Sequence, residues 1–462
     1  MQIIMTNRSF SKIALFLLVA LSAAAVFAQT ATPAADIAAK VDEYMNARLD
    51  AKGVGGAVLI MKNGKPLAAK GYGLADSETK APIKADTKFR IGSVTKQFTA
   101  ALILGLQEDG KLNVQEPVCK YVDPCPEAWK PVTLHHLLSM TSGITSITSL
   151  PNWRSELRFK DLTPAEVVAQ VAALPLKAAP GEVYEYSNTN YIVLGSIIEK
   201  LSGKSYEEVL NERIIKPLGL KNTGLDDGKK KLANSAAGYT MKGNSAAKAD
   251  VVSIITPFSA GAMYSTTEDL YAWQTALLGG RVFKKKETLD AMLTPNKNNY
   301  AYGLIVVTDR KGRKRITHGG GIEGFIADSV YFPEEELFIA ALTNNDRNAM
   351  GEVMGALNAI AVGEPYTLPK KRVAIKVDPA VLDTYVGEYQ IGPVMTLKIE
   401  RGPEGLTLEP TGQSKTQLYA ETETDFYLTV VDATLKFVKD ETGKVTGLEF
   451  TQAGRTSKAV KK

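Results

Sequence analysis

A serine and a lysine three positions apart, Ser93 and Lys96, carry the most informative chemistry in the sequence. At the start of a helix, residues at this spacing lie on one face, so their side chains can meet. An amine beside a serine hydroxyl can accept its proton and make the oxygen a nucleophile. The spacing alone is weak, because three other S-x-x-K matches begin at Ser9, Ser77 and Ser245.

Ser93 differs from the other three matches in the segments that come after it along the chain. An almost wholly apolar run from Phe98 to Leu106 predicts a buried helix directly after it. Further on come Tyr186-Ser187-Asn188 and then His318-Gly319-Gly320. The three motifs in this order predict that Ser93 is a catalytic nucleophile.

Lys96 and Tyr186 are the two candidate bases. Lys96 must be neutral to accept a proton, and burial near the positive end of a helix lowers a lysine pKa. Tyr186 follows Pro180-Gly181, which predicts a loop, and is also a candidate proton donor to the leaving group. The sequence leaves open which of the two accepts the first proton.

The remaining motif residues predict substrate contacts. Asn188 can both donate and accept, so it can hold a substrate amide and also Lys96. His318 can hydrogen-bond the substrate or Tyr186 and titrates near neutral pH. Glycines along a strand edge let a substrate lie against the backbone without side-chain clashes. These glycines are Gly319, Gly320 and Gly321.

Each of these residues also has a purely structural interpretation. Lys96 could form an ion pair, and Tyr186 could be a buried structural phenol. Asn188 could stabilise a turn, and His318 could simply end a strand. The adjacent His135 and His136 point apart on a helix and are expected to be structural.

Over about residues 35–362 the chain resembles the penicillin-recognising serine hydrolases, such as class C β-lactamases, DD-carboxypeptidases, D-aminopeptidases and related esterases. The three motifs carry this resemblance, together with the segments Leu134–Ile144 and Met263–Leu270. It implies an acyl-enzyme on Ser93, an oxyanion hole made by the backbone N–H groups of Ser93 and Gly321, and no cofactor. His318 stands where many relatives carry the Lys of a K-T-G motif, which lowers the expectation of β-lactamase activity more than that of hydrolysis.

The elements that must position these residues form two blocks of strands around a helical middle. Gly56–Lys62 and Lys65–Tyr72 are predicted strands on either side of Asn63-Gly64, a strong hairpin signal. The later predicted strands are Tyr302–Thr308, Phe325–Phe332 and Leu337–Leu342. The middle and closing helices are expected at Thr163–Ala173, Tyr191–Leu201, Thr267–Leu278 and Met350–Val362. This order predicts an α/β fold, with a sheet flanked by helices beside an all-α lobe and the site in the cleft between them.

The chain divides after this region. Residues 29–363 are the expected hydrolase domain, and 364–379 have the composition of a linker. Short alternating segments in residues 380–462 predict a small all-β accessory domain, a barrel or a sandwich. We expect this domain to fold separately and to restrict access to the cleft.

The first 28 residues are predicted to be a signal peptide. Arg8 and Lys12 precede an apolar stretch from Ile13 to Leu21, and Val26-Phe27-Ala28 fits a cleavage site. The protein is therefore expected to be periplasmic or secreted. An uncleaved anchor is the alternative, but this stretch is too short to span a bilayer, and no later apolar run reaches membrane length.

Export favours a disulfide between the two cysteines of the chain, Cys119 and Cys125, over two free thiols. With no third thiol, three histidines in all and no H-E-x-x-H, a metal site is not expected. The net charge of +5 and scattered lysine runs argue against nucleic acid as a partner. Gly203-Lys204-Ser205 resembles the end of a phosphate loop, but Ile198 replaces its first glycine.

The sequence therefore predicts an exported serine hydrolase that forms an acyl-enzyme on an ester or amide, with a D-amino-acid peptide as the favoured substrate. Alternatives within this class are a carboxylesterase or a weak β-lactamase. A non-catalytic peptidoglycan-binding or sensor protein on the same fold is the alternative from another class. The oligomeric state stays open.

Overall fold

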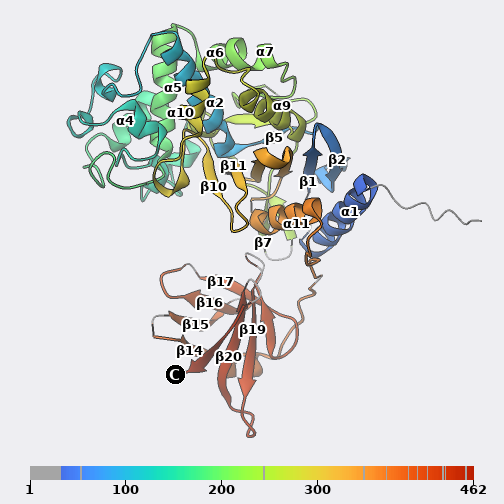
Figure 1. Cartoon of the computed structure of the whole chain (residues 1–462). Coiled ribbons are helices and arrows are strands. Elements are labelled where there is room, and N and C mark those ends of the chain that lie inside the picture. The colour runs from blue at the N-terminus through green and yellow to red at the C-terminus, as the bar shows by residue number, and fades with distance from the viewer. Residues whose placement is uncertain are drawn as a thin grey trace, which may run out of the picture.

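The computed structural model describes two bodies, an α/β domain and a β-barrel, joined by an extended segment (Figure 1). The described residues are 33–52, 55–230, 232–242, 245–346, 349–370, 372–393, 395–402, 404–413, 415–428, 431, 433–452 and 455–462. The predicted signal peptide, residues 1–28, lies outside them.

The α/β domain is built on a six-stranded antiparallel sheet in the order β10-β11-β12-β13-β1-β2. The pairing of β1 with β13 brings the first strand of the chain beside the last strand of the sheet. The strands are β1 (Gly56–Lys62), β2 (Lys65–Tyr72), β10 (Ile305–Thr308), β11 (Lys314–Ile322), β12 (Phe325–Phe332) and β13 (Leu337–Thr343).

Alternation along the central strands builds a separate core on each face of this sheet. Leu59 and Ala340 join the core shared with the helical lobe, whereas Ile60 and Ile339 join the core beneath α1 and α11. All of β13 is buried, because helices cover both of its faces. The two helices of the smaller core are α1 (Pro33–Lys52) and α11 (Met350–Val362), which lie side by side in Figure 1.

The helical lobe surrounds α2 (Thr95–Glu108), whose residues from Thr95 to Leu104 are all buried. Its helix α5 packs against α2 and begins earlier than the predicted Tyr191, at Asn188. The remaining helices of the domain are α3 (Leu134–Leu138), α4 (Pro164–Val171), α5 (Asn188–Ser202), α6 (Tyr206–Leu210), α7 (Lys216–Leu218), α8 (Phe258–Gly261), α9 (Thr267–Leu278) and α10 (Lys286–Leu293). Short strands complete it: β3 (Leu74–Asp76), β4 (Ala81–Pro82), β5 (Phe89–Arg90), β6 (Gly224–Leu225), β7 (Tyr239–Lys242), β8 (Ser245–Lys248) and β9 (Met263–Ser265).

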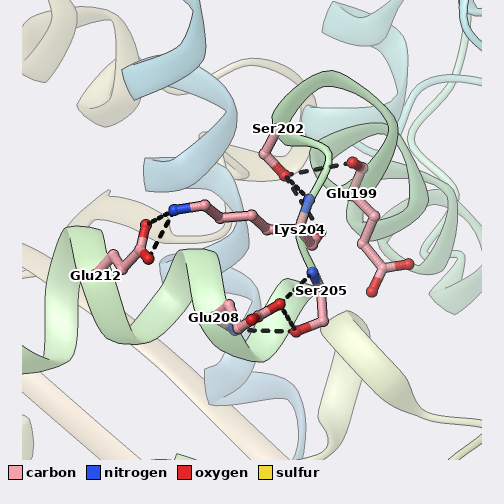
Figure 2. A network of polar contacts seen from close by, with 6 residues as sticks. All are labelled: Glu199, Ser202, Lys204, Ser205, Glu208 and Glu212. Atoms are coloured by element: carbon pink, nitrogen blue, oxygen red, sulfur yellow. Dashed lines mark hydrogen bonds and ion pairs between the residues drawn. The ribbon is translucent and has the colours of Figure 1, made fainter.

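The turn between α5 and α6 is held by its own side chains, as Figure 2 shows. Gly203 takes a left-handed φ of 68° that ends α5. Ser205 and Glu208 form a reciprocal capping box at the start of α6. The Lys204 ammonium lies 2.7 Å from Glu212, so both polar side chains of the phosphate-loop-like sequence have protein partners.

Some predicted boundaries are confirmed by these elements, and others are not. Asn63 and Gly64 have φ angles of 49° and 72°, which makes a tight hairpin between β1 and β2. The predicted strand Tyr302–Thr308 is shorter, because only Ile305–Thr308 pairs with β11. Strand β11 was expected only as the strand that carries the three glycines on its edge, without bounds, and it extends from Lys314 to Ile322.

The C-terminal part is a closed barrel of eight strands, so the sandwich alternative is wrong. Its core includes Tyr385, Tyr389 and Phe437, and Tyr385 stacks on Phe437 at a ring distance of 4.1 Å. The helix α12 (Pro379–Tyr385) precedes the strands. These are β14 (Gly387–Ile391), β15 (Met395–Gly402), β16 (Gly405–Pro410), β17 (Thr416–Ala420), β18 (Asp425–Tyr427), β19 (Ala433–Lys439), β20 (Val445–Gln452) and β21 (Arg455–Lys461).

The segment between the two bodies contacts the α/β domain near its start and the barrel near its end. Near its start, the Tyr366 ring meets Tyr44 of α1 edge to face at 6.3 Å. Near its end, the Ile375 N–H donates to the Ala420 carbonyl at 2.9 Å. In the helical lobe, Cys119 and Cys125 are joined in a disulfide with a Cα–Cα distance of 5.2 Å.

Candidate active site

Ser93 lies in a 3₁₀ turn, Gly92–Val94, where the chain passes from β5 into α2. Strand β11 runs so close to this turn that a Cβ on Gly320 would stand 2.0 Å from the Ile91 carbonyl oxygen and 2.8 Å from the Ser93 nitrogen. The glycine at position 320 is therefore required by packing within the protein, and its role in substrate binding stays a prediction. Gly319 and Gly321 are exposed and face the opposite way, so their backbone is open on that side of the strand.

Lys96 is completely buried beneath Ser93, with an exposed fraction of 0%. Its Nζ lies 2.9 Å from Ser93 Oγ, 2.9 Å from Asn188 Oδ1 and 2.8 Å from the Ala260 carbonyl oxygen. Among the described residues Lys96 forms no ion pair with a carboxylate. Burial holds the pKa of the Lys96 amine well below its usual range, which favours the neutral form.

Tyr186 approaches the same pair from the loop before α5. Its hydroxyl hydrogen-bonds Ser93, and the Lys96 nitrogen lies 4.8 Å from the centre of its ring. Burial raises the pKa of Tyr186 above its ordinary value, and the hydrogen bond with Ser93 only partly opposes this. Tyr186 is thus held as a neutral phenol, able to donate a proton, rather than as a tyrosinate.

Asn188 is the first residue of α5, and its side-chain amide is held in one orientation. Its Oδ1 faces Lys96, while its Nδ2 donates to Thr148 Oγ1 at 3.2 Å. Its backbone N–H donates to Ser146 Oγ at 3.1 Å. Because Thr148 also hydrogen-bonds Ser146, a short loop of the helical lobe orients the amide toward Lys96.

His318 lies on β11 with an exposed fraction of 4%. Its Nδ1 is 2.6 Å from the Gly319 carbonyl oxygen, which can only accept, so Nδ1 carries the proton. Its Nε2 then accepts from the Tyr300 hydroxyl at 3.1 Å. Burial is the main cause that lowers the pKa of His318 to about 4, so the predicted titration near neutral pH is wrong.

The predicted contact between His318 and Tyr186 is replaced by the contact with Tyr300. The His318 and Tyr186 rings are 6.4 Å apart, whereas Tyr300 packs edge to face on both of them. Nothing in the spacing of the motifs pointed to Tyr300, to the Ala260 carbonyl or to Thr148. All three come from segments that lie far from Ser93 in the sequence, Ala260 from helix α8.

The other two histidines lie away from Ser93 and have structural partners. His136 Nδ1 accepts the Thr133 N–H and completes the cap of α3. His135 hydrogen-bonds the Tyr302 hydroxyl at 2.7 Å. Among the described residues, no group of His, Cys, Asp and Glu could hold a metal ion.

A cleft of about 1010 Å³ opens beside Ser93. It runs past Asn188 and the exposed backbone of Gly319 and Gly321 toward Asp328 and Met350. Lys96 and His318 are buried and do not line it. The geometry therefore presents one serine oxygen to a bound molecule and keeps the groups that act on it away from water.

Comparison with known proteins identifies the family. The Beta-lactamase family matches residues 37–363. The chain belongs to this family of serine hydrolases. Residues 371–459 match DUF3471, a domain of unknown function.

Among curated relatives, "Penicillin-binding protein 4*" of Bacillus subtilis (strain 168) is 27% identical over 84% of this chain and 90% of its own length. "Protein flp" of Staphylococcus aureus (strain MW2) is 30% identical over 66% of this chain, which spans 62% of that protein.

Two solved structures share the fold at comparable identity. The octameric penicillin-binding protein homologue from Pyrococcus abyssi is 25% identical, covers 91% of this chain and 99% of its own, and has a TM-score of 0.63. A D-stereospecific amidohydrolase from Streptomyces sp. is 26% identical, covers 71% of this chain and 100% of its own, and has a TM-score of 0.61.

No helix in the described part of the chain combines the length and apolar character needed to cross a membrane.

Proposed function

We propose that this protein is an exported hydrolase that cleaves an ester or amide through an acyl-enzyme on Ser93, with a D-amino-acid amide or peptide as the favoured substrate. The observation that carries the proposal is the contact of Ser93 Oγ with Lys96, a buried amine that has no carboxylate partner among the described residues. A lysine held in this way is a base, because its neutral form is the stable one.

The contacts of Lys96 favour it over Tyr186 as the base for acylation. The Asn188 Oδ1 and the Ala260 carbonyl can only accept, so the two N–H bonds of a neutral Lys96 amine point at them. The lone pair is then directed toward Ser93 Oγ, the third partner. Tyr186, whose pKa is raised by burial, is the better donor.

In this mechanism the Ser93 oxygen attacks the carbonyl carbon while its proton moves to Lys96. The backbone N–H groups of Ser93 and Gly321 would stabilise the oxyanion that develops. The bond to the leaving group then breaks, and Tyr186 donates the proton that the leaving group needs, with Lys96 restoring the proton on Tyr186. Water attacks the resulting ester by the same route in reverse, releasing the acid and free Ser93.

The likeness to a D-stereospecific amidohydrolase supports a D-amino-acid amide as substrate. The buried His318 also supports it, since a neutral histidine with both ring nitrogens occupied offers no positive charge to a substrate carboxylate. This argues against β-lactams and acyl-D-Ala-D-Ala, which carry a carboxylate close to the reacting bond.

Covalent labelling tests the proposal. A fluorophosphonate should add one adduct to the mature protein, mapped by mass spectrometry to the peptide that contains Ser93. Ser93→Ala should remove both the adduct and turnover of D-aminoacyl anilides and p-nitrophenyl esters. Ser77→Ala is the matched control, because Ser77 begins another S-x-x-K match, is exposed, and should change neither. Failure to label, or an adduct elsewhere, would favour a non-catalytic binding protein.

A further inference from the structure

Asp328 lines the cleft beside a residue of the neighbouring strand that carries no side chain. It is on β12, directly opposite Gly319 of β11 in the antiparallel register. Its Oδ2 is 3.7 Å from the place where a Cβ on Gly319 would stand. Because position 319 carries no side chain and is exposed, a group lying along β11 can reach this carboxylate across the strand.

Asp328 has few partners within the protein. Thr317 Oγ1 lies 3.3 Å from its Oδ1, but makes its shorter bond, of 2.7 Å, to the Ser329 carbonyl. The backbone of Ser329 donates a further hydrogen bond, and the charge of Arg315 acts from a distance. In the described part of the chain, no lysine or arginine forms an ion pair with Asp328.

Two other acidic residues of the cleft, Asp250 and Glu323, differ from Asp328 in this respect. Arg158 pairs with Asp250 at 2.7 Å and with Glu323 at 3.3 Å. Asp346 accepts the Gly324 N–H at 3.0 Å. Burial raises the pKa of Asp328 to about 6, as expected for a carboxylate that is removed from water and forms no ion pair, and the charge of Arg315 opposes this only in part. A carboxylate in this state gains most from a positively charged partner.

We propose that Asp328 binds an ammonium group of the substrate, carried by the part that lies across Gly319. The ligand class is a primary amine on an amino-acid amide, ester or peptide. This inference rests on the proposed function, since it assigns substrate recognition to the same cleft. The neutral His318 on the neighbouring strand supports it, because it adds no positive charge that would repel the ammonium, and Arg315 of the same strand acts on Asp328 without forming an ion pair with it.

Ligand binding to the Ser93→Ala protein tests the inference without turnover. The probes are D-phenylalanine amide, which carries an ammonium, and N-acetyl-D-phenylalanine amide, which does not, each measured by titration calorimetry. Adding Asp328→Asn should lower the preference for the amine by about 10–100-fold, the range of a charge-assisted hydrogen bond. Adding Asp250→Asn removes the same charge from a carboxylate that Arg158 already holds, so the preference should stay within about threefold.

The outcomes separate this inference from the proposed function. An unchanged preference in the Asp328→Asn protein, an equal loss in the Asp250→Asn protein, or no preference for the amine at all would overturn the role of Asp328. Inactivity of the wild-type protein toward every ester and amide would overturn the proposed function, while the binding preference would still report on Asp328. Circular dichroism of each variant shows whether a loss reflects unfolding.

Discussion

The α/β domain and the barrel bury different kinds of side chain. The core of the α/β domain includes a lysine, a histidine and many hydroxyl and amide groups, among them Lys96, Asn190 and His318. In the described part of the barrel, the buried side chains are apolar or aromatic. Burying a polar group costs free energy unless it is hydrogen-bonded, so such groups collect where a function requires them. This difference indicates that the chemistry takes place in the α/β domain. The core of the barrel is held by apolar packing.

Among the substitutions that test this difference between the two bodies, Lys96→Met is expected to have the largest effect on activity. Turnover should fall by about 10²–10⁴-fold, because Ser93 keeps its proton without a base. The loss should not add to that of Ser93→Ala, since the two residues act as one unit. Thermal stability should be unchanged or higher, because an apolar side chain of similar length replaces a buried amine. Kinetics and calorimetric melting on one preparation check both parts, and a large drop in Tm would show that Lys96 is mainly structural.

Truncating a core side chain of the barrel should have the opposite effect, lowering stability while hydrolysis is retained. Phe437→Ala removes a ring that stacks on Tyr385 and should destabilise the barrel by about 3–5 kcal/mol, with hydrolysis retained. The matched change in the other body is Phe98→Ala, where the lost ring stacks on Trp273 at 4.3 Å directly after the catalytic turn. That variant should lose both stability and activity. Loss of hydrolysis in Phe437→Ala would show that the two bodies do not melt independently.

The stability of the protein should depend on pH through the protonation of His318. Its pKa is lowered to about 4 in the folded protein from an ordinary value of 6.5, so the unfolded chain binds more protons between these values. The contribution is present above pH 6.5 and is lost as the pH falls through 4, amounting to about 3 kcal/mol. Asp328, with its pKa raised to about 6, has the opposite sign: its contribution is present below pH 4 and is lost as the pH rises through 6.

Melting curves between pH 4 and pH 7 measure this effect. His318→Gln should flatten the acid-side loss of stability, and Asp328→Asn should steepen it. Parallel curves for wild type and both variants would mean that neither group is as strongly shifted as its burial implies.

Removal of residues 371–462 gives the smallest expected effect. All the residues that line the cleft in the described structure lie between Ser93 and Met350, so the barrel supplies no wall to it. We expect kcat/KM for p-nitrophenyl acetate to stay constant and that for long peptides to rise about two- to fivefold, if the barrel restricts access to the cleft. Unchanged kinetics with every substrate would refute that role.

Local sequence was sufficient to predict much of the scaffold. The hairpin at Asn63-Gly64, the buried helix after Ser93 and the strands around Pro333 are all short-range patterns, and the structure confirms them. The bounds of strand β11 could not be predicted in this way, because Gly319, Gly320 and Gly321 have low strand propensity and form a strand only between their neighbours.

The sequence by itself determined the family, the order of the three motifs and the identity of the residues able to react. Only the tertiary structure decided the protonation states, the hydrogen-bond directions and the surroundings of those residues. The desolvation of Lys96, the tautomer of His318 and the position of Asp328 opposite Gly319 each depend on partners from elements that are separate in the chain. A pKa and a hydrogen-bond direction are properties of the surroundings, and folding brings those surroundings together.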